Sequence, residues 1–214
     1  MTRIALIHAL AHSVAPINEE LERAWPQTQR MNLLDDSLSA DLVRSGQGLD
    51  AAMHQRFEML AAYAESTGAQ AILFTCSAFG PCIEAVAARR PHMPVLKPNE
   101  AMVTEAVGQG GRIGLIASFA PTLASMPPEF PAGTDLFTVL AEGAMQALNE
   151  GDTARHDALV VQAAQSLARQ GCRVIALAQF SMARAQVAVQ QAVGLPVLTT
   201  PGSAVRELRQ RLLS

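Results

Sequence analysis

Cys76 is the residue whose type and position most directly suggest chemistry. It follows a short apolar run in AILFTCSAFGPCIEAVAARR (residues 71–90), and a segment of helical period starts directly after it. A helix N-terminus offers unpaired backbone N–H groups and a partial positive charge, and both lower the pKa of a nearby thiol. The same N–H groups can hold a carboxylate or an enolate oxygen. The turn therefore predicts a reactive thiol beside an anion site, with a small buried residue at a tight turn as the alternative.

The segments around Cys76 alternate between strand-like and helix-like patterns. Apolar runs of strand length lie at residues 3–10, 30–37, 70–77 and 93–98. Segments of helical period lie between them, at residues 16–25, 48–67 and 80–90. Alternation of this kind is typical of βαβ units, which form a parallel sheet with helices on both faces. The sequence therefore predicts an α/β fold.

The second half of the sequence repeats the first. RIALIHAL from Arg3 is matched by RIGLIASF from Arg112, and GAQAILFTCSAFG from Gly68 by GCRVIALAQFSMA from Gly171. MPVLKPNEAM is matched in the same order by LPVLTTPGSAV. Three ordered matches predict a duplicated α/β unit. We expect a first half made of residues 1–98 plus 200–214 and a second half made of residues 99–199.

Two facing α/β units place a cleft between the carboxyl ends of their strands, where ligands bind in open sheets. Residues just after each strand are therefore site candidates: His8, Asp35, Asp36, Thr75, Cys76, Ser77 and Lys97, then Ser118, Thr122, Glu142, Gln179, Ser181 and Thr199. The repeat makes Gln179 the counterpart of Cys76, and Ser181 can cap the helix that follows, as Ser77 can after Cys76. Polar residues thus close both buried strands at matching positions, which favours a functional site over plain packing.

Composition narrows the function classes. Half of the residues are hydrophobic (50%), 16% are charged, 4% are aromatic and the net charge is −3, which argues against disorder and against nucleic-acid binding. No apolar run approaches the ~18 residues of a transmembrane helix, and the N-terminal segment is interpreted as a strand rather than a signal peptide. Three widely spaced cysteines (Cys76, Cys82, Cys172) predict reduced thiols in a cytoplasmic protein. The histidine and cysteine spacing predicts no metal site.

The repeated halves and Thr75-Cys76-Ser77 carry a family resemblance. The sequence resembles the aspartate/glutamate/hydantoin racemase superfamily, which includes maleate isomerases and arylmalonate decarboxylases and whose first cysteine turn is commonly Cys-Asn-Thr. The resemblance implies two pseudo-symmetric Rossmann-like domains, an active site between them and a small carboxylate substrate. It also implies chemistry without a cofactor, in which one thiolate removes the α-proton and a second thiol delivers a proton to the opposite face.

The second cysteine turn of the family, usually Gly-Cys-Thr, is matched here by Ala178-Gln179-Phe180. A glutamine amide does not titrate in the usable range, so it cannot serve as acid or base. One thiol therefore remains, and three functions stay open. The first is a racemase or isomerase in which Cys76 is nucleophile or proton donor. The others are a single-thiol lyase or decarboxylase, and a carboxylate-binding protein that has lost turnover.

His8 is the remaining acid/base candidate, because imidazole titrates near neutrality and Cys–His pairs are common. It follows the first strand, where glutamate-type racemases often carry Asp-Ser; the alternative is a neutral histidine hydrogen-bonded at a strand end. Carboxylate binding or enolate stabilisation is assigned to Thr75, Ser77, Ser118, Thr122, Gln179 and Ser181. Asp35 and Asp36 are interpreted as a helix start, with a gate over the cleft as the functional alternative. Lys97 is interpreted as a solvated lysine, with attraction of an anionic substrate as the alternative. His156 is interpreted as a surface residue, and the protein as a homo-oligomer.

Overall fold

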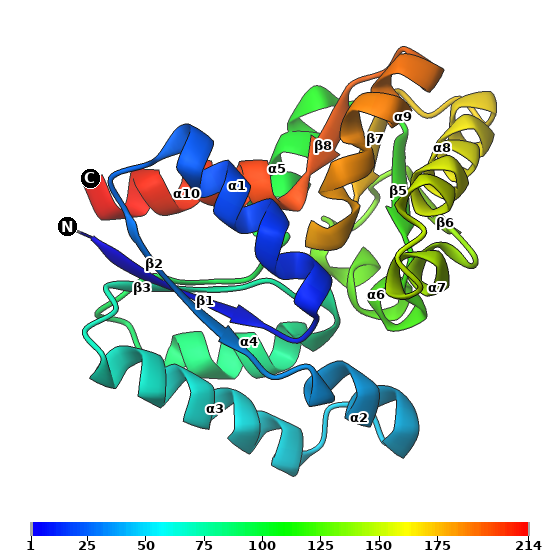
Figure 1. The fold of residues 1–214 in the computed structure, drawn as a ribbon. Helices are drawn as coiled ribbons and strands as arrows, with labels where there is room; N and C mark the ends of the chain where they lie inside the picture. The colour runs from blue at the N-terminus through cyan, green and yellow to red at the C-terminus, as the bar shows by residue number, and fades with distance from the viewer. Residues whose placement is uncertain (1, 214) are drawn as a thin grey trace.

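The computed structural model describes residues 2–213; Met1 and Ser214, both assigned to the predicted first half, lie outside the described residues. The chain forms two four-stranded parallel sheets with strand orders β2-β1-β3-β4 and β6-β5-β7-β8 (Figure 1). The first sheet contains β1 (Arg3–His8), β2 (Gln29–Leu34), β3 (Ala71–Phe74) and β4 (Val95–Leu96). The second contains β5 (Ile113–Ala117), β6 (Leu136–Leu140), β7 (Val174–Leu177) and β8 (Val197–Thr199). The predicted α/β fold with two pseudo-symmetric halves is confirmed.

Helices flank both sheets. Around the first are η1 (Ala11–Ser13), α1 (Val14–Ala24), α2 (Ser37–Ser45), α3 (Ala51–Ser66), η2 (Ser77–Phe79) and α4 (Gly80–Ala88). The second half adds α5 (Glu100–Gln109), α6 (Ala120–Ser125), η3 (Pro127–Glu129), α7 (Ala144–Asn149), α8 (Thr153–Arg169), η4 (Phe180–Ala185) and α9 (Gln186–Val193), before α10 (Thr200–Leu213). The longest helices, α3 and α8, start in the same way, because Asp50 and Asp152 each accept a hydrogen bond from a backbone N–H in the first turn.

Alternation along the buried strands divides the first core into two layers. Ile7 and Phe74 pack on the side of α3 and α4, whereas Leu6 and Leu73 pack on the side of α1 and α10. Figure 1 shows α1 and α10 on one face of this sheet and α3 and α4 on the other. Helix α10 therefore returns to the first sheet after the second half is complete. No helix among residues 2–213 is long and apolar enough to span a membrane.

Strand register shows how closely the halves correspond. Ile4 pairs with Ala71 in the first sheet, and Ile113 pairs with Val174 in the second. The pairing continues to Ile7–Phe74 and to Ile116–Leu177 at the strand ends. Cys76 and Gln179 each lie two residues beyond these last pairs, so the two side chains occupy equivalent positions.

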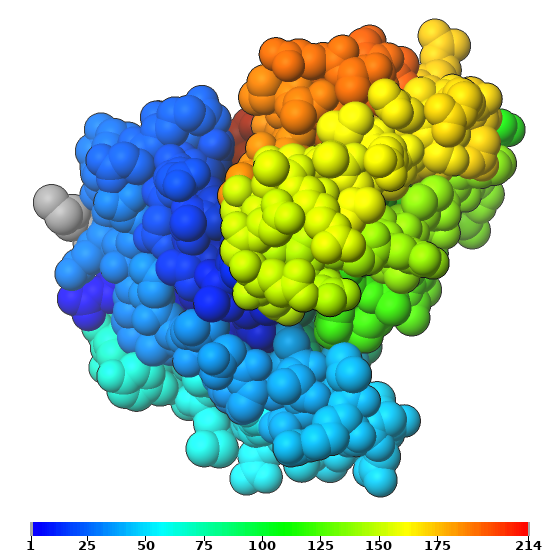
Figure 2. Space-filling model, turned by 45° about the vertical axis from the view of Figure 1, so that its right-hand side comes forward, coloured from blue at the N-terminus to red at the C-terminus, as the bar shows by residue number. Residues whose placement is uncertain are grey.

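Two phenylalanines from the second half pack into the first. Phe119 follows β5 and packs against the apolar cluster that contains Ile7 and Phe74. Phe180 follows Gln179 and is fully buried (0% exposed) in the cluster with Leu6 and α10 residues. Figure 2 shows the second half, coloured from green to orange, pressed directly against the blue segment of the first. The strand ends thus meet at a closely packed junction.

Candidate active site between the two halves

Cys76 lies at the carboxyl end of the first sheet in extended backbone (φ −120°, ψ 119°), directly before η2. Burial raises the pKa of its thiol to about 11, and hydrogen bonds from the Ala78 backbone and the Ser39 side chain lower it only in part. The thiol is therefore neutral near pH 7. The expectation of a lowered pKa was wrong, because the thiol packs against the apolar core and η2 separates it from the start of α4.

His8 is fully buried (0% exposed) at the end of β1. Its Nδ1 lies 2.8 Å from Thr75 Oγ1, and its Nε2 lies 2.9 Å from Asn32 Oδ1. Burial lowers the pKa of His8, which the hydrogen bond to Asn32 Oδ1 offsets in part, so the ring is neutral near pH 7. Both ring nitrogens are thus occupied by protein groups, which is the arrangement of a histidine held at a strand end.

The His8 ring and the Cys76 thiol lie on opposite faces of the first sheet. Ile7 and Phe74, the residues just before His8 and Thr75, face α3 and α4, so His8 and Thr75 face α1. Asn32, the partner of His8, also exchanges hydrogen bonds with Asn18 of α1. Cys76 instead packs with the α3 and α4 cluster. The structure therefore groups His8 with Thr75 rather than with the thiol.

The second half contributes a fixed amide. The backbone N–H and the hydroxyl of Ser118 both donate to Gln179 Oε1, at 2.6 and 3.1 Å. Because Oε1 is occupied by these donors, the amide orientation is set and the Nε2 group remains to donate to another acceptor. Both side chains are 8% exposed. The counterpart of the thiol is therefore a positioned hydrogen-bond donor.

Ser77 joins the halves instead of capping a helix. Its hydroxyl donates to Thr122 Oγ1 at 3.2 Å, and its carbonyl accepts from the Ser125 hydroxyl at 2.9 Å. Thr122 is fully buried. Ser181, predicted to lie at the same site, is buried, and its hydroxyl has no hydrogen-bond partner among the described residues.

Two candidate carboxylates lie outside this group. Asp35 accepts from the backbone N–H and hydroxyl of Ser37 and pairs with Arg56 at 2.7 Å. Asp36 lies at the N-cap position of α2 but makes no side-chain capping bond. The helix-start interpretation of this pair therefore agrees with the structure, although Asp35 rather than Asp36 makes the hydrogen bonds.

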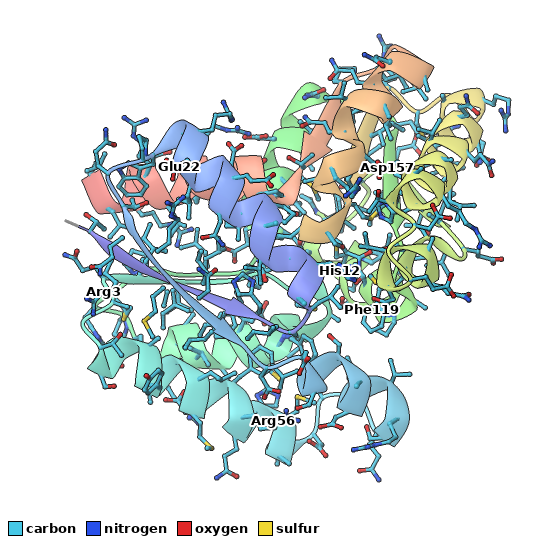
Figure 3. The ribbon with its side chains drawn as sticks, in the orientation of Figure 1. Arg3, His12, Glu22, Arg56, Phe119 and Asp157 are labelled. Carbon is cyan, nitrogen blue, oxygen red and sulfur yellow. The ribbon has the colours of Figure 1, made fainter. Side chains whose placement is uncertain are left out.

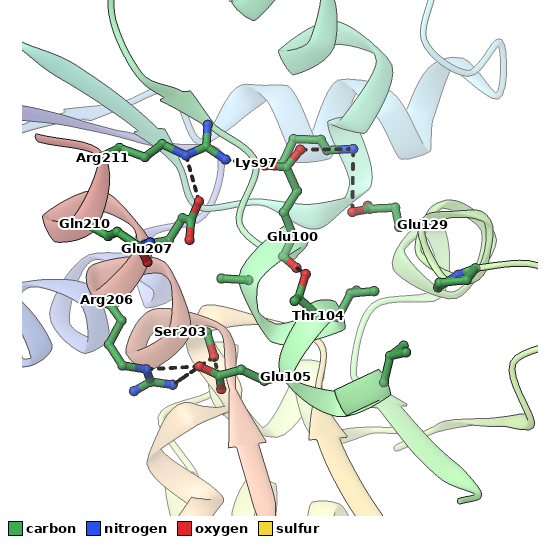
Figure 4. A pocket seen from close by; sticks show the side chains of 14 residues that line it. Lys97, Glu100, Thr104, Glu105, Glu129, Ser203, Arg206, Glu207, Gln210 and Arg211 are labelled. Atoms are coloured by element: carbon green, nitrogen blue, oxygen red, sulfur yellow. Dashed lines mark hydrogen bonds and ion pairs between the residues drawn. The ribbon is translucent and has the colours of Figure 1, made fainter. Parts of the chain in front are cut away.

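Lys97 is not a solvated lysine. Its ammonium lies 2.6 Å from Glu84, and its side chain is 13% exposed. The ammonium also lies 3.8 Å from Glu129 (Figure 4). It belongs to a cavity of about 750 Å³ between α5, α10 and η3, whose charged side chains largely pair with one another. Because this cavity is not lined by Cys76 or Gln179, it is not the candidate active site.

His156 is not on the surface, as the sequence interpretation had it, but fully buried in α8. Its Nδ1 contacts Asp157, whereas Nε2 has no partner among the described residues. The helical period could have predicted that His156 is buried, because Val160, Ala163 and Leu167 lie on the same face of α8 and are also buried.

Two polar contacts of the site were missed from the sequence. Ser39 hydrogen-bonds to Cys76 and donates to the Ala9 carbonyl at 2.8 Å, and Asn32 holds His8. Asn32 could have been found once β2 was placed beside β1, since register brings it to this edge; no local pattern marks Ser39. Among residues 2–213, no cluster of three or more His, Cys, Asp or Glu side chains is arranged to hold a metal ion.

The comparisons with known proteins agree with this architecture. The model of the Asp/Glu/hydantoin racemase family matches residues 11–208. A glutamate racemase from Bacillus anthracis has a similar fold, with a TM-score of 0.79 at 14% identity over 99% of this chain and 82% of that one. An aspartate racemase from Picrophilus torridus has a TM-score of 0.70 at 12% identity, over 94% of this chain and 90% of that one.

An allantoin racemase from Klebsiella pneumoniae gives a TM-score of 0.68 at 14% identity, over 100% of this chain and 88% of that one. No curated protein sequence matches the chain. At these identities the structural similarity establishes the fold alone, whereas the family model covers most of the sequence. The chain belongs to the Asp/Glu/hydantoin racemase family.

Proposed function

We propose that the chain is a cofactor-independent enzyme of this family that acts on a small carboxylic acid through one thiol, that of Cys76. The observation that carries the proposal is the equivalence of Cys76 and Gln179 at the two central strand ends. One position offers a transferable proton, and the other offers a fixed N–H donor. A carboxylate held by the Gln179 amide would place its α-carbon between the halves, within reach of the thiol.

An isomerase of the racemase type is the class that family membership favours. Racemisation needs one group to remove a proton and another to deliver one to the opposite face. Near pH 7 the neutral His8 ring can accept a proton and the neutral Cys76 thiol can donate one, so their protonation states are complementary. For this reaction the ring has to give up its contact with Thr75. We assign His8 the role of second base on this basis.

A single-thiol lyase is the second candidate, and one observation favours it. Both His8 nitrogens are hydrogen-bonded within the protein, which leaves the Cys76 thiol as the free proton donor. Loss of carbon dioxide from a substrate that keeps a second carboxylate on the same carbon generates an enediolate, which needs one protonation, on one face. The bond to carbon dioxide breaks, its electron pair enters the enediolate, and the thiol proton is then transferred to carbon.

The experiment is turnover of candidate carboxylic acids in deuterated water by wild type, Cys76→Ser and Cys172→Ala. Deuterium at the α-carbon with inversion supports racemisation, and released carbon dioxide supports the lyase. Cys76→Ser should lower turnover by about 10²–10⁴-fold, the usual contribution of a positioned acid or base. Cys172 precedes β7, at the end of the strand opposite the candidate site, so Cys172→Ala should keep full turnover. Full activity of Cys76→Ser would contradict the proposal.

A further inference from the structure

The cavity beside Lys97 lies apart from the candidate active site. It measures about 750 Å³ and is bounded by α5, which connects the two sheets along the chain, by α10, which returns to the first sheet, and by η3. His12 and Phe119, labelled at the junction of the halves in Figure 3, are not among its lining residues. Neither are Cys76 and Gln179. A ligand in this cavity would therefore not compete for the thiol.

The two arginines that α10 contributes to the cavity are paired with carboxylates. Arg206 lies 2.5 Å from Glu105 of α5, and Glu105 also accepts from the Ser203 hydroxyl at 2.8 Å. Arg211 lies 2.7 Å from Glu207, one turn earlier on the same helix. An anionic ligand would have to compete with these carboxylates for the guanidinium groups. The arginines therefore do not form an anion site.

Negative charge is in excess at the other end of the cavity, around the Lys97 ammonium (Figure 4). This ammonium lies 2.6 Å from Glu84, 3.7 Å from Glu100 and 3.8 Å from Glu129. Lys97 is the only lysine of the chain. Arg211 is 4.0 Å from Glu100, at the limit of an ion pair, and its charge is neutralised elsewhere. Three carboxylates thus share one ammonium, which leaves an excess of two negative charges.

Glu129 has an unsatisfied carboxylate oxygen. Its side chain is 12% exposed, and its Oε2 atom has no hydrogen-bond partner among residues 2–213. Its Oε1 atom accepts one long hydrogen bond, of 3.4 Å, from Asn99 Nδ2. Asn99 is fully buried, and its own Oδ1 atom is also unpartnered within the described part of the chain. Two neighbouring acceptors therefore lack a donor, a cost that a charged N–H group would remove.

From these observations we propose that the cavity binds a small aliphatic diamine with both amino groups protonated. One ammonium donates to Glu129 and the other to Glu100, and the two charges match the excess of two carboxylates. A short alkyl spacer reaches from one to the other, because both carboxylates contact the same lysine, and it packs on the apolar side chains Ala101 and Val103. Among residues 2–213 the carboxylates are not arranged to hold a metal ion, which favours an organic cation.

Isothermal titration calorimetry of the full-length protein with putrescine tests the proposal. At low ionic strength we expect one site with a Kd below about 1 mM. The monoamine n-butylamine, which lacks the second ammonium, should bind at least about tenfold more weakly. Magnesium chloride at matched ionic strength should not displace putrescine. Cys76→Ser should bind putrescine as wild type does, which keeps this inference separate from the proposed function.

Three variants locate the site. Glu129→Gln removes one charge with little change in shape and should weaken putrescine binding about tenfold. Glu19→Gln makes the same change at an exposed position of α1 and should leave the Kd within about twofold of wild type. Lys97→Met removes the resident ammonium and should tighten putrescine binding about tenfold, because three carboxylates are then left without it.

The outcomes are distinct. Weaker binding by Glu129→Gln, with Glu19→Gln unchanged, supports the site. Equal affinity of wild type, Glu129→Gln and Glu19→Gln would mean that putrescine binds elsewhere, and the absence of saturable binding would equally overturn the proposal. Binding of n-butylamine as tight as that of putrescine would refute a dication ligand. Displacement of putrescine by magnesium would refute an organic one.

Discussion

The turn after β3 and the turn after β7 have the same place in their sheets and opposite chemistry. In the first, His8 bonds Thr75, and the repeat aligns this pair with Ala117 and Ala178. In the second, Ser118 bonds Gln179, which aligns with Ala9 and Cys76. Each half thus has one hydrogen-bonded polar pair. At the two equivalent positions, the other half has alanine at one or both.

Under the proposed function, this difference divides the work of one site between the two halves. Duplication places two strand ends at a common junction, but it does not oblige them to do the same thing. In that proposal the first half supplies the groups that exchange a proton, Cys76 and His8. The second half supplies the Gln179 amide that would hold the carboxylate. The comparison therefore predicts that variants of the two turns will affect different measurable quantities.

The third positions of the turns differ as well. Ser77 donates a hydrogen bond to Thr122, whereas its counterpart Phe180 is buried in the core of the first sheet. Both residues fasten one half to the other, the first by a hydrogen bond and the second by apolar burial. The second turn should therefore matter more for stability.

The largest effect is expected for Phe180→Ala. Removing a fully buried phenylalanine leaves a cavity between the halves, and the free energy of unfolding should fall by about 3–5 kcal/mol. Chemical denaturation monitored by circular dichroism measures the loss. Val187→Ala, at a side chain that is 64% exposed on the neighbouring α9, should change stability by less than about 0.5 kcal/mol. Equal effects of the two variants would contradict the anchoring role.

Gln179→Glu isolates the donor function of the second turn. A glutamate can still accept the two hydrogen bonds from Ser118, but it replaces the N–H donor by a negative charge. The substrate carboxylate would be repelled, so kcat/KM should fall about 10- to 100-fold, mainly through KM. Gln191→Glu, at an exposed position, is the matched control. A variant that lowers kcat alone would instead indicate that Gln179 acts in the chemical step.

Glu129 contrasts with both turns, because it is a buried carboxyl at the junction rather than at the site (Figure 4). Burial raises the pKa of Glu129, with Lys97 and Asn99 opposing the shift in part. A raised folded-state pKa means that the carboxyl stabilises the fold below its unfolded pKa, and that this contribution is lost as pH rises through the folded pKa. At neutral pH the ionised, buried group is a cost.

Glu129→Gln should therefore raise the melting temperature at pH 7 by about 2–4 °C, which corresponds to about 1 kcal/mol in a chain of this size. The difference from wild type should shrink near pH 4, where the carboxyl is protonated. Lys97 keeps its contact with Glu84 in the variant. A lower melting temperature at pH 7 would show that the Lys97 pair outweighs desolvation.

The smallest effect is expected for the hydrogen bond between Ser77 and Thr122. Each of Ser77→Ala and Thr122→Val should lower the free energy of unfolding by about 0.5–1.5 kcal/mol, and the double variant should cost less than the sum. Thermal unfolding of the four proteins gives the coupling energy directly. Strict additivity would mean that the hydroxyls do not interact.

Much of this arrangement could be predicted from the sequence. Apolar runs mark the strands because buried parallel strands are hydrophobic on both faces, and the internal repeat by itself aligns Cys76 with Gln179. The division into residues 1–98 plus 200–214 and residues 99–199 stays a prediction, as do the catalytic and binding roles of the site residues.

The electrostatics and the side-chain partners could not be predicted. The pKa of Cys76 depends on how closely the halves pack, and sequence position alone suggested the wrong sign. The separation of His8 from the thiol depends on which helix covers which face of the sheet. Strand alternation predicts that the side chains of His8 and Cys76 point to opposite faces of the sheet. Only the three-dimensional structure shows that α1 covers one face and α3 covers the other.

Helix α10 has a consequence for biosynthesis. Its Ala204, Val205 and Leu208 complete the layer formed by Leu6 and Leu73, yet they are separated from that layer by the whole second half of the chain. As the polypeptide emerges from a ribosome, this face of the first sheet is covered only in part, by α1, until residues 200–213 have been made. The second half can therefore fold while the first is still incomplete, and the nascent chain exposes an apolar surface that chaperones would recognise.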